Sequence, residues 1–172
     1  IIDSEAFSVV RLSKIYRQAE SSHIVLNAHK INAGELITLN NKNKDFFFFE
    51  KQDVRSVMGA LIYLVKTKLP EYIGTSPFEI QVLTPMRKGE LGVEHLNEVL
   101  QYYLNPASES KKEKEGRTGV FREGDKVMQV KNNYKLEWKI TNAKGFSVEE
   151  GLGVFNGDMG VIKQINTYSE RI

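Results

Sequence analysis

Several features that define common classes of protein are absent from this sequence. It contains no cysteine, which excludes disulfide bonds, thiolate metal ligands and cysteine nucleophiles. No apolar run approaches the roughly 18 residues that a membrane-spanning helix needs, so no membrane partner is predicted. Neither the phosphate-loop motif G-x-x-x-x-G-K-[ST] nor the G-x-S-x-G nucleophile motif occurs. The three histidines are not spaced as a metal-binding pair, so we predict no metal site and no self-contained hydrolytic site.

The composition that remains is that of a globular protein. The 172 residues are 41% hydrophobic and 27% charged, which suits one domain, or one domain with a small insert. The net charge of +2 is too small to diagnose or to exclude a nucleic-acid partner. The lack of cysteine and of a signal-peptide pattern predicts a cytoplasmic location. Because the chain begins without Met, we expect it to be a segment of a longer protein.

Strand and helix signals alternate through the first two thirds of the chain. The predicted strands are residues 8–15, 46–49 and 78–83, of which the second is four consecutive phenylalanines and is expected to be buried on both faces. The predicted helices are one capped by Ser21 or Ser22 and ended by Gly34, one capped by Asp53 and stopped by Pro70, and one over residues 93–104. This alternation predicts an α/β fold with a parallel sheet and flanking helices.

The pattern changes after Ala107. Residues 108–116 are polar and predict an exposed loop or linker. Residues 125–131 and 160–165 predict short strands, and the Asn-Gly pair within residues 155–158 predicts a hairpin turn, because both central positions of such a turn need a positive φ. Residues 139–153 are expected to form a longer loop. So few strands do not make a stable barrel, so we expect an incomplete β unit.

Polar and basic residues follow two of the predicted strands. Tyr16, Arg17 and Gln18 follow the first strand, and the run from Thr84 to Lys88 follows the third. The carboxyl ends of parallel strands meet at one edge of a sheet, where ligands gather. An arginine there can bind a phosphate, although position alone favours the simpler interpretation, in which Arg17 pairs with a surface carboxylate.

Three blocks of the sequence resemble the second motor domain of RecD-like helicases, which are superfamily-1 DNA helicases related to the alpha subunit of exodeoxyribonuclease V. The first block is LSKIYRQAESSHI with NAHKINAG in residues 12–34. The second is VLTPMRKG with LGV and LNP in residues 82–106, and the third is GDKVMQ, NNY and VFNGDMGVI in residues 124–162. The resemblance implies a RecA-like second motor domain over residues 1–107, a linker over 108–119, and part of an SH3-like β insert over 120–172.

The resemblance also implies an activity for the whole protein. It would be a bacterial cytoplasmic ATP-dependent helicase that moves 5′ to 3′ on single-stranded DNA in recombination or repair. Arg17 would be a catalytic arginine finger that reaches the γ-phosphate of ATP, and Gln18 would help to bind ATP. Mg²⁺ would be held by a first motor domain outside this sequence, so this segment is expected to be inactive alone and to hold no cofactor tightly.

The expected DNA contacts in this domain are Thr84, Arg87 and Lys88, since hydroxyls and basic side chains hold a phosphate backbone. Less strongly indicated contacts are Asn27, His29, Asn132, Asn133 and Tyr134. Asn132 and Asn133 are equally well explained as turn residues, and Tyr134 as a core residue of the insert.

Partners and alternatives follow from the same reasoning. The implied partners are single-stranded DNA, the first motor domain and, where the parent acts in one, the subunits of a nuclease complex. One alternative is a non-catalytic scaffold that binds nucleic acid or protein. Another is a nuclease-complex subunit whose motor has decayed.

Overall fold

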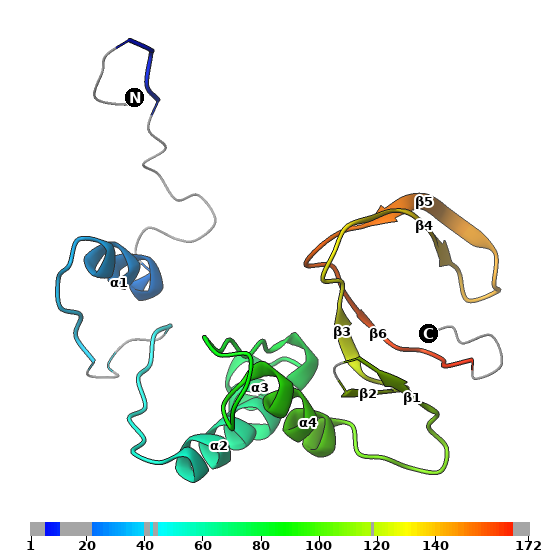
Figure 1. Cartoon of the computed structure of the whole chain (residues 1–172), viewed down its shortest axis with the longest axis horizontal. Coiled ribbons are helices and arrows are strands. Elements are labelled where there is room, and N and C mark those ends of the chain that lie inside the picture. The colour runs from blue at the N-terminus through cyan, green and yellow to red at the C-terminus, as the bar shows by residue number, and fades with distance from the viewer. Residues whose placement is uncertain (1–5, 11–21, 40–41, 43–44, 118, 167–172) are drawn as a thin grey trace. The chain divides into compact units, whose positions relative to one another are not determined.

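The computed structural model describes residues 6–10, 22–39, 42, 45–117 and 119–166. The chain divides into two units, Ile1–Lys51 and Gln52–Ile172, and each is described by itself. Figure 1 labels the helices and strands. Among the described residues, no helix has the length and apolarity that crossing a membrane requires.

The described part of the first unit contains one helix, α1 (His23–Asn32). Ser22 precedes it in an extended conformation, and the Asp45 carboxylate accepts hydrogen bonds from the Ser22 hydroxyl at 2.7 Å and from the His23 backbone N–H at 2.8 Å. Gly34 follows the helix with φ 75°. The helix predicted between Ser22 and Gly34 is therefore confirmed.

The phenylalanine run does not form the predicted buried strand. Residues 46–50 have irregular backbone, and Phe49 is 59% exposed. A strand takes its backbone hydrogen bonds from a neighbouring strand, and no strand pairs with this segment in the part of the chain that the structure describes. The predicted strand 8–15 lies partly outside the described residues, and residues 8–10 of it are irregular.

The second unit begins with a continuous helical stretch. It comprises α2 (Val54–Tyr63), a π-helical turn η2 (Leu64–Lys68) and α3 (Leu69–Ile73). Asp53 caps it as predicted, because its carboxylate accepts from the Ser56 N–H at 2.9 Å. The predicted stop at Pro70 is wrong. The wider π turn directly before Pro70 relieves the clash between a proline ring and the preceding helical turn, and the helix continues to Gly74 with φ 74°.

The predicted strand 78–83 is also absent. Residues Pro77–Glu79 form the 3₁₀ turn η3, and residues 80–83 are irregular. The Lys126 ammonium group donates to the backbone carbonyls of Phe78 and Ile80. These carbonyls therefore have a side-chain partner where a strand would need a neighbouring backbone.

Helix α4 (Val93–Leu104) is confirmed over its predicted range. Gly92 lies at its N-cap, Leu96 is buried, and Asn105 ends it with φ −137°.

The strands of the described residues all lie in the second unit and form three antiparallel pairs. β1 (Glu113–Gly116) pairs with β2 (Gly119–Arg122), β3 (Lys126–Met128) with β6 (Met159–Val161), and β4 (Asn133–Thr141) with β5 (Ser147–Val154). Part of the predicted loop 108–116 is thus strand β1. The predicted loop 139–153 is instead most of the β4–β5 hairpin, because Asn142 and Gly145 form a tight turn inside it.

The turn at residues 155–158 is present, with an Asp158 N–H to Phe155 carbonyl bond of 3.0 Å and Gly157 at φ 99°. It joins β5 to β6, which pair with different strands, so it is a turn but not the hairpin that was predicted. Successive pairing of β4 with β5 and of β3 with β6 makes one long, bent ribbon (Figure 1).

The described residues thus combine helices with antiparallel strands, and the parallel sheet of the prediction is not seen among them. Their buried apolar side chains are few: Val25 in the first unit, and Val65, Leu96, Ile162 and Ile165 in the second. The strands β1 to β6 and the residues that follow them, here called the β unit, contribute Ile162 and Ile165. The base of the β unit, near β3 and β6, is therefore better buried than the β4–β5 ribbon.

Candidate nucleic-acid interface

The loop before α4 holds three of the predicted DNA-contact residues in a closed conformation. The Thr84 hydroxyl donates to the Leu91 carbonyl at 2.7 Å. The N–H groups of Val93 and Glu94, in the first turn of α4, donate to the carbonyls of Met86 and Arg87 at 3.0 and 3.2 Å. Thr84 therefore holds the loop in shape, and the loop is fixed to the start of the helix.

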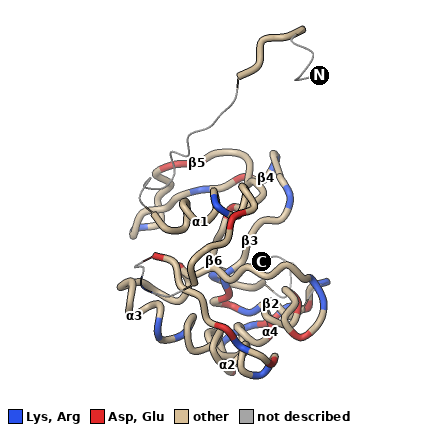
Figure 2. Tube along the Cα trace, turned by 90° about the vertical axis from the view of Figure 1, so that its left-hand side faces the viewer, with Lys and Arg blue, Asp and Glu red and all other residues tan. Residues whose placement is uncertain are grey.

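Two basic side chains extend from this loop. Arg87 lies 3.1 Å from the Glu94 carboxylate, and Lys88 is exposed. Gly92 has no room for a side chain, because a Cβ there would lie 2.6 Å from the Lys88 backbone. The loop therefore passes close to the helix start and presents Arg87 and Lys88 outward. Elsewhere in the second unit Lys and Arg are interspersed with Asp and Glu (Figure 2).

A second candidate surface lies where β4 begins. The Asn132 amide donates to the Tyr134 hydroxyl at 2.9 Å, and its oxygen accepts from the Asn156 N–H at 2.8 Å. The Asn133 oxygen accepts from the Lys135 N–H at 3.2 Å. Asn133 thus makes the local backbone bond expected of a turn residue, whereas the backbone bond of Asn132 is to Asn156, 24 positions away.

Tyr134 is not a core residue, which corrects one of the two interpretations of this position. It is 66% exposed and meets Phe155 edge to face, with ring centroids 5.8 Å apart. Phe155 is half exposed and was not predicted as a site residue. The sequence signal that could have identified Phe155 is its position directly before the Asn-Gly turn, since that turn folds the chain back beside the start of β4.

The other predicted residues belong to other parts of the chain. Asn27 and His29 lie in α1, in the first unit. His29 is exposed, whereas Asn27 is only 6% exposed and its amide nitrogen has no hydrogen-bond partner among the described residues. Arg17 and Gln18 lie outside the described residues. Among the described residues, no cluster of His, Asp and Glu is able to hold a metal ion.

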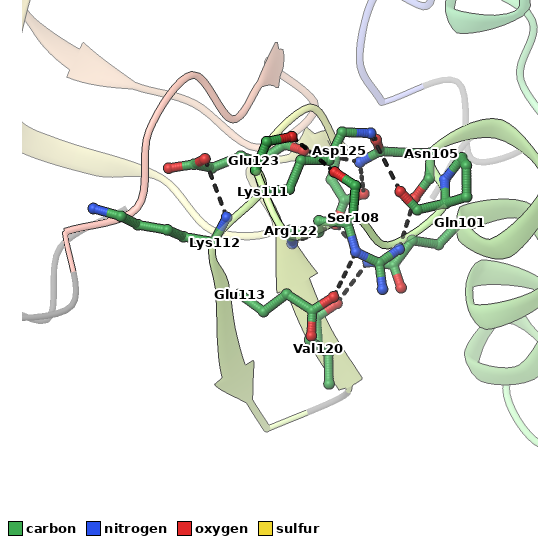
Figure 3. Close-up of polar contacts among 12 residues, drawn as sticks. Gln101, Asn105, Ser108, Lys111, Lys112, Glu113, Val120, Arg122, Glu123 and Asp125 are labelled. Atoms are coloured by element: carbon green, nitrogen blue, oxygen red, sulfur yellow. Dashed lines mark hydrogen bonds and ion pairs between the residues drawn. The ribbon is translucent and has the colours of Figure 1, made fainter.

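A buried polar network, which the sequence did not indicate, joins α4 to the β unit (Figure 3). Its centre is Asn105 and Asp125, which are 6% and 9% exposed. The Asn105 amide donates to the Asp125 carboxylate at 2.7 Å. That carboxylate also accepts from the Gln101 side chain at 2.6 Å and from the Arg122 N–H at 2.7 Å.

The rim of this network contains two further carboxylates. Glu113 pairs with Arg122 at 2.6 Å. Glu123 accepts from the backbone N–H groups of Ile165 and Lys112 at 2.8 and 3.2 Å. The bond from Ile165, followed by that from Lys112, holds the pKa of the Glu123 carboxyl below its ordinary value. The network therefore connects α4, β1, β2 and the segment after β6.

Comparison with known proteins places these features in a family context. Residues 96–172 match the domain family described as "ATP-dependent RecD-like DNA helicase SH3 domain". The chain is 30% identical to the "ATP-dependent RecD2 DNA helicase" of Deinococcus radiodurans over 159 residues, and these residues make up 92% of this chain. It spans only 18% of the length of that relative. The family match begins inside α4, so it includes the network at the end of that helix.

Proposed function

The chain is related to the RecD-like DNA helicases, and we propose that it is a segment of an ATP-dependent DNA helicase. Residues 1–107 would belong to its second, RecA-like motor domain, and the β unit to its SH3-like domain, separated by the stretch 108–119. The observation that carries the proposal is the coverage, because relatedness to a RecD2 helicase extends over 92% of the chain and one part of it matches the SH3 domain family. The parent would move 5′ to 3′ on single-stranded DNA.

Arg17 would act as an arginine finger in this protein. A guanidinium group brought to the γ-phosphate offsets the charge that develops as the phosphoryl group leaves, and such fingers raise rates by about 10³ to 10⁵ in other phosphoryl-transfer systems. Gln18 would help to orient the nucleotide. As the family resemblance implies, Mg²⁺ would be held by the first motor domain.

Single-stranded DNA would be held at two places in the second unit. The closed loop 84–92 would present Arg87 and Lys88 to phosphates, with Thr84 maintaining the loop. At the start of β4, exposed aromatic rings beside asparagines would support base stacking, which contributes roughly 1–3 kcal/mol per base in other proteins. His29 and Asn27, in the first unit, are further contact candidates. The other partners would be the first motor domain and, where present, nuclease subunits.

The experiment that tests this function is the ATPase rate of the full-length parent, with and without single-stranded DNA. We expect strong stimulation by DNA, lost in Arg17→Ala with ATP binding retained. Arg55→Ala is the matched control, because Arg55 is an exposed arginine on α2. If the wild-type protein has no ATPase activity, the scaffold or decayed-motor alternative replaces the helicase. Full activity of Arg17→Ala would remove only the assignment of the finger.

A further inference from the structure

Asn105 uses every polar group it has to connect α4 with the β unit. Its backbone N–H donates to the Gln101 carbonyl within the helix at 2.8 Å. Its backbone carbonyl accepts from the Arg122 guanidinium at 2.6 Å. Its side-chain nitrogen donates to Asp125 and to the Glu123 carbonyl, and its side-chain oxygen accepts from Lys111. A residue with all its groups bonded to different segments fixes their relative orientation.

Asp125 extends the connection into the β-strands. Besides the three donors to its carboxylate, its backbone carbonyl accepts from the Ile162 N–H at 2.9 Å, and the neighbouring Gly124 N–H donates to the Ile162 carbonyl at 2.8 Å. A buried carboxylate is tolerated only where donors satisfy it. Rotation of α4 away from the strands would remove the Gln101 and Asn105 donors and leave Asp125 with the Arg122 N–H alone, so the bonded arrangement is preferred.

A second attachment restrains the β unit at another point. Lys126, in β3, donates to the backbone carbonyls of Phe78 and Ile80, which precede α4 by more than ten residues. The two attachments use neighbouring residues of the β unit, Asp125 and Lys126, but different segments of the helical part, so together they restrict rotation more than either attachment alone. The strands near β3 are therefore held to the helical part of the unit at both places.

The two candidate DNA surfaces adjoin different parts of this connected body. The loop 84–92 is bonded to the first turn of α4, and the network is at its last turn, about 18 Å away for 12 residues at 1.5 Å each. The Tyr134–Phe155 pair adjoins β3 and β6, since Gln129 bonds to Gly157 and Asp158 at 2.9 and 2.8 Å. An unbroken series of bonds thus connects the two surfaces.

We infer that Gln101 and Asn105 are positioning residues of a rigid joint, which keeps the loop 84–92 and the Tyr134–Phe155 surface aligned so that one DNA strand engages both. The inference rests on the proposed function for its DNA partner, but the rigidity of the joint does not. Two binding surfaces held at a span that suits one strand act together, and their combined affinity falls when the span varies, because the effective concentration of the second surface falls.

The joint is tested first by distance measurement in the chain itself. Because the natural sequence has no cysteine, Glu98→Cys on α4 and Lys163→Cys after β6 provide two unique sites for spin labels at exposed positions. We expect a narrow distance distribution, broadened in Asn105→Ala and Gln101→Ala and unchanged in Asn97→Ala, which removes an exposed amide from the same helix. A narrow distribution in both joint variants would overturn the inference.

Reversing the central pair separates a joint from general destabilisation. Asn105→Asp alone places two carboxylates together and is expected to broaden the distribution. In the double variant Asn105→Asp with Asp125→Asn, the amide at position 125 donates to the carboxylate at position 105. The oxygen of that amide can still accept from Gln101 and Arg122. We expect this double variant to regain a narrower distribution. Folding of each variant is checked by circular dichroism, and Gln101→Ala remains informative if Asn105→Ala does not fold.

DNA affinity distinguishes a positioning role of Gln101 from a merely structural one, because only a positioning role should affect long DNA more than short DNA. Affinity is measured for a short oligo(dT), which reaches one surface, and for a long oligo(dT), which reaches both. We expect Gln101→Ala to bind the short DNA as the wild type does and to lose about tenfold in affinity for the long DNA. Equal losses for both lengths, or none, would overturn the inference. Absence of any DNA binding by the wild type would instead contradict the proposed function, and the distance measurement would still decide the joint.

Discussion

Gly124→Ala tests the packing at the joint most directly. Gly124 has φ +92°, and a Cβ added there would lie 3.1 and 3.2 Å from the oxygen and nitrogen of the Asn105 side-chain amide. The substitution therefore combines two penalties. An alanine at positive φ costs roughly 1–2 kcal/mol. Displacing the Asn105 amide leaves buried polar groups unsatisfied, at about 1–3 kcal/mol.

Gly157→Ala separates these two penalties. Gly157 has a similar φ of +99°, but a Cβ there would have nothing within 4 Å. It carries the backbone penalty alone, so the difference in unfolding free energy between the two variants measures the packing at Asn105. We expect Gly124→Ala to be less stable than Gly157→Ala by about 1–3 kcal/mol.

Urea denaturation followed by circular dichroism measures the difference, with equal slopes required for the comparison. In a thermal scan each kcal/mol should correspond to about 2–4 °C for a chain of this size. Equal stability of the two variants would show that the Asn105 amide moves aside at little cost. The network around Asn105 would then be easily deformed, and the joint would not be rigid.

Three further predictions concern other parts of the molecule. The pKa of Asp45 is held below its ordinary value chiefly because the Ser22 hydroxyl donates to its carboxylate. The resulting stabilisation of α1 should be present above the ordinary pKa and lost as pH falls through the lowered one, and an NMR titration should show the Asp45 pKa raised in Ser22→Ala. Gly151→Ala places a Cβ 2.5 Å from the Trp138 ring, so the emission of this single tryptophan should shift while the Gly160→Ala control, with open space, leaves it unchanged. For DNA binding, Lys88→Ala should reduce the slope of log K against log salt by about 0.7, as expected for one phosphate contact on a single strand, and an unchanged slope would remove Lys88 from the interface.

The helices were predictable because their signals are local. Asp53 and Gly34 bond to backbone groups within a few residues, so local signals placed one helix start and one helix end correctly. Ser22 does precede α1, but its hydroxyl bonds to Asp45, 23 positions away, and makes no cap bond to the helix. The helix end predicted at Pro70 was wrong because a single π turn accommodates the proline ring. No local sequence pattern predicts such a turn.

The strands were less predictable because their partners are distant in the chain. Four consecutive phenylalanines indicate burial, but burial needs a neighbouring layer, and none covers Phe49 within the described unit. Residues 139–153 were interpreted as a longer loop between two predicted strands. Their polar residues suit an exposed two-stranded ribbon equally well, since one face of it stays in water.

The candidate site was predicted in part. The run from Thr84 to Lys88 does form one structured loop, although the internal role of the Thr84 hydroxyl was not foreseen. The pair of Asn105 and Asp125 was not found, because its members are 20 positions apart and each residue is common at a helix end or a turn. Only packing brings them together.

The long bent ribbon also has a consequence for how the β unit folds. At its tip, Thr141 faces Ser147, six positions away, whereas Lys126 faces Val161, thirty-five positions away. Closing the larger loop first would cost about 1.6 kcal/mol more in chain entropy than closing the smaller one. We therefore expect the ribbon to nucleate at its tip and to zip toward its base, so that β3 and β6 meet last and the joint with α4 forms only once the ribbon is complete.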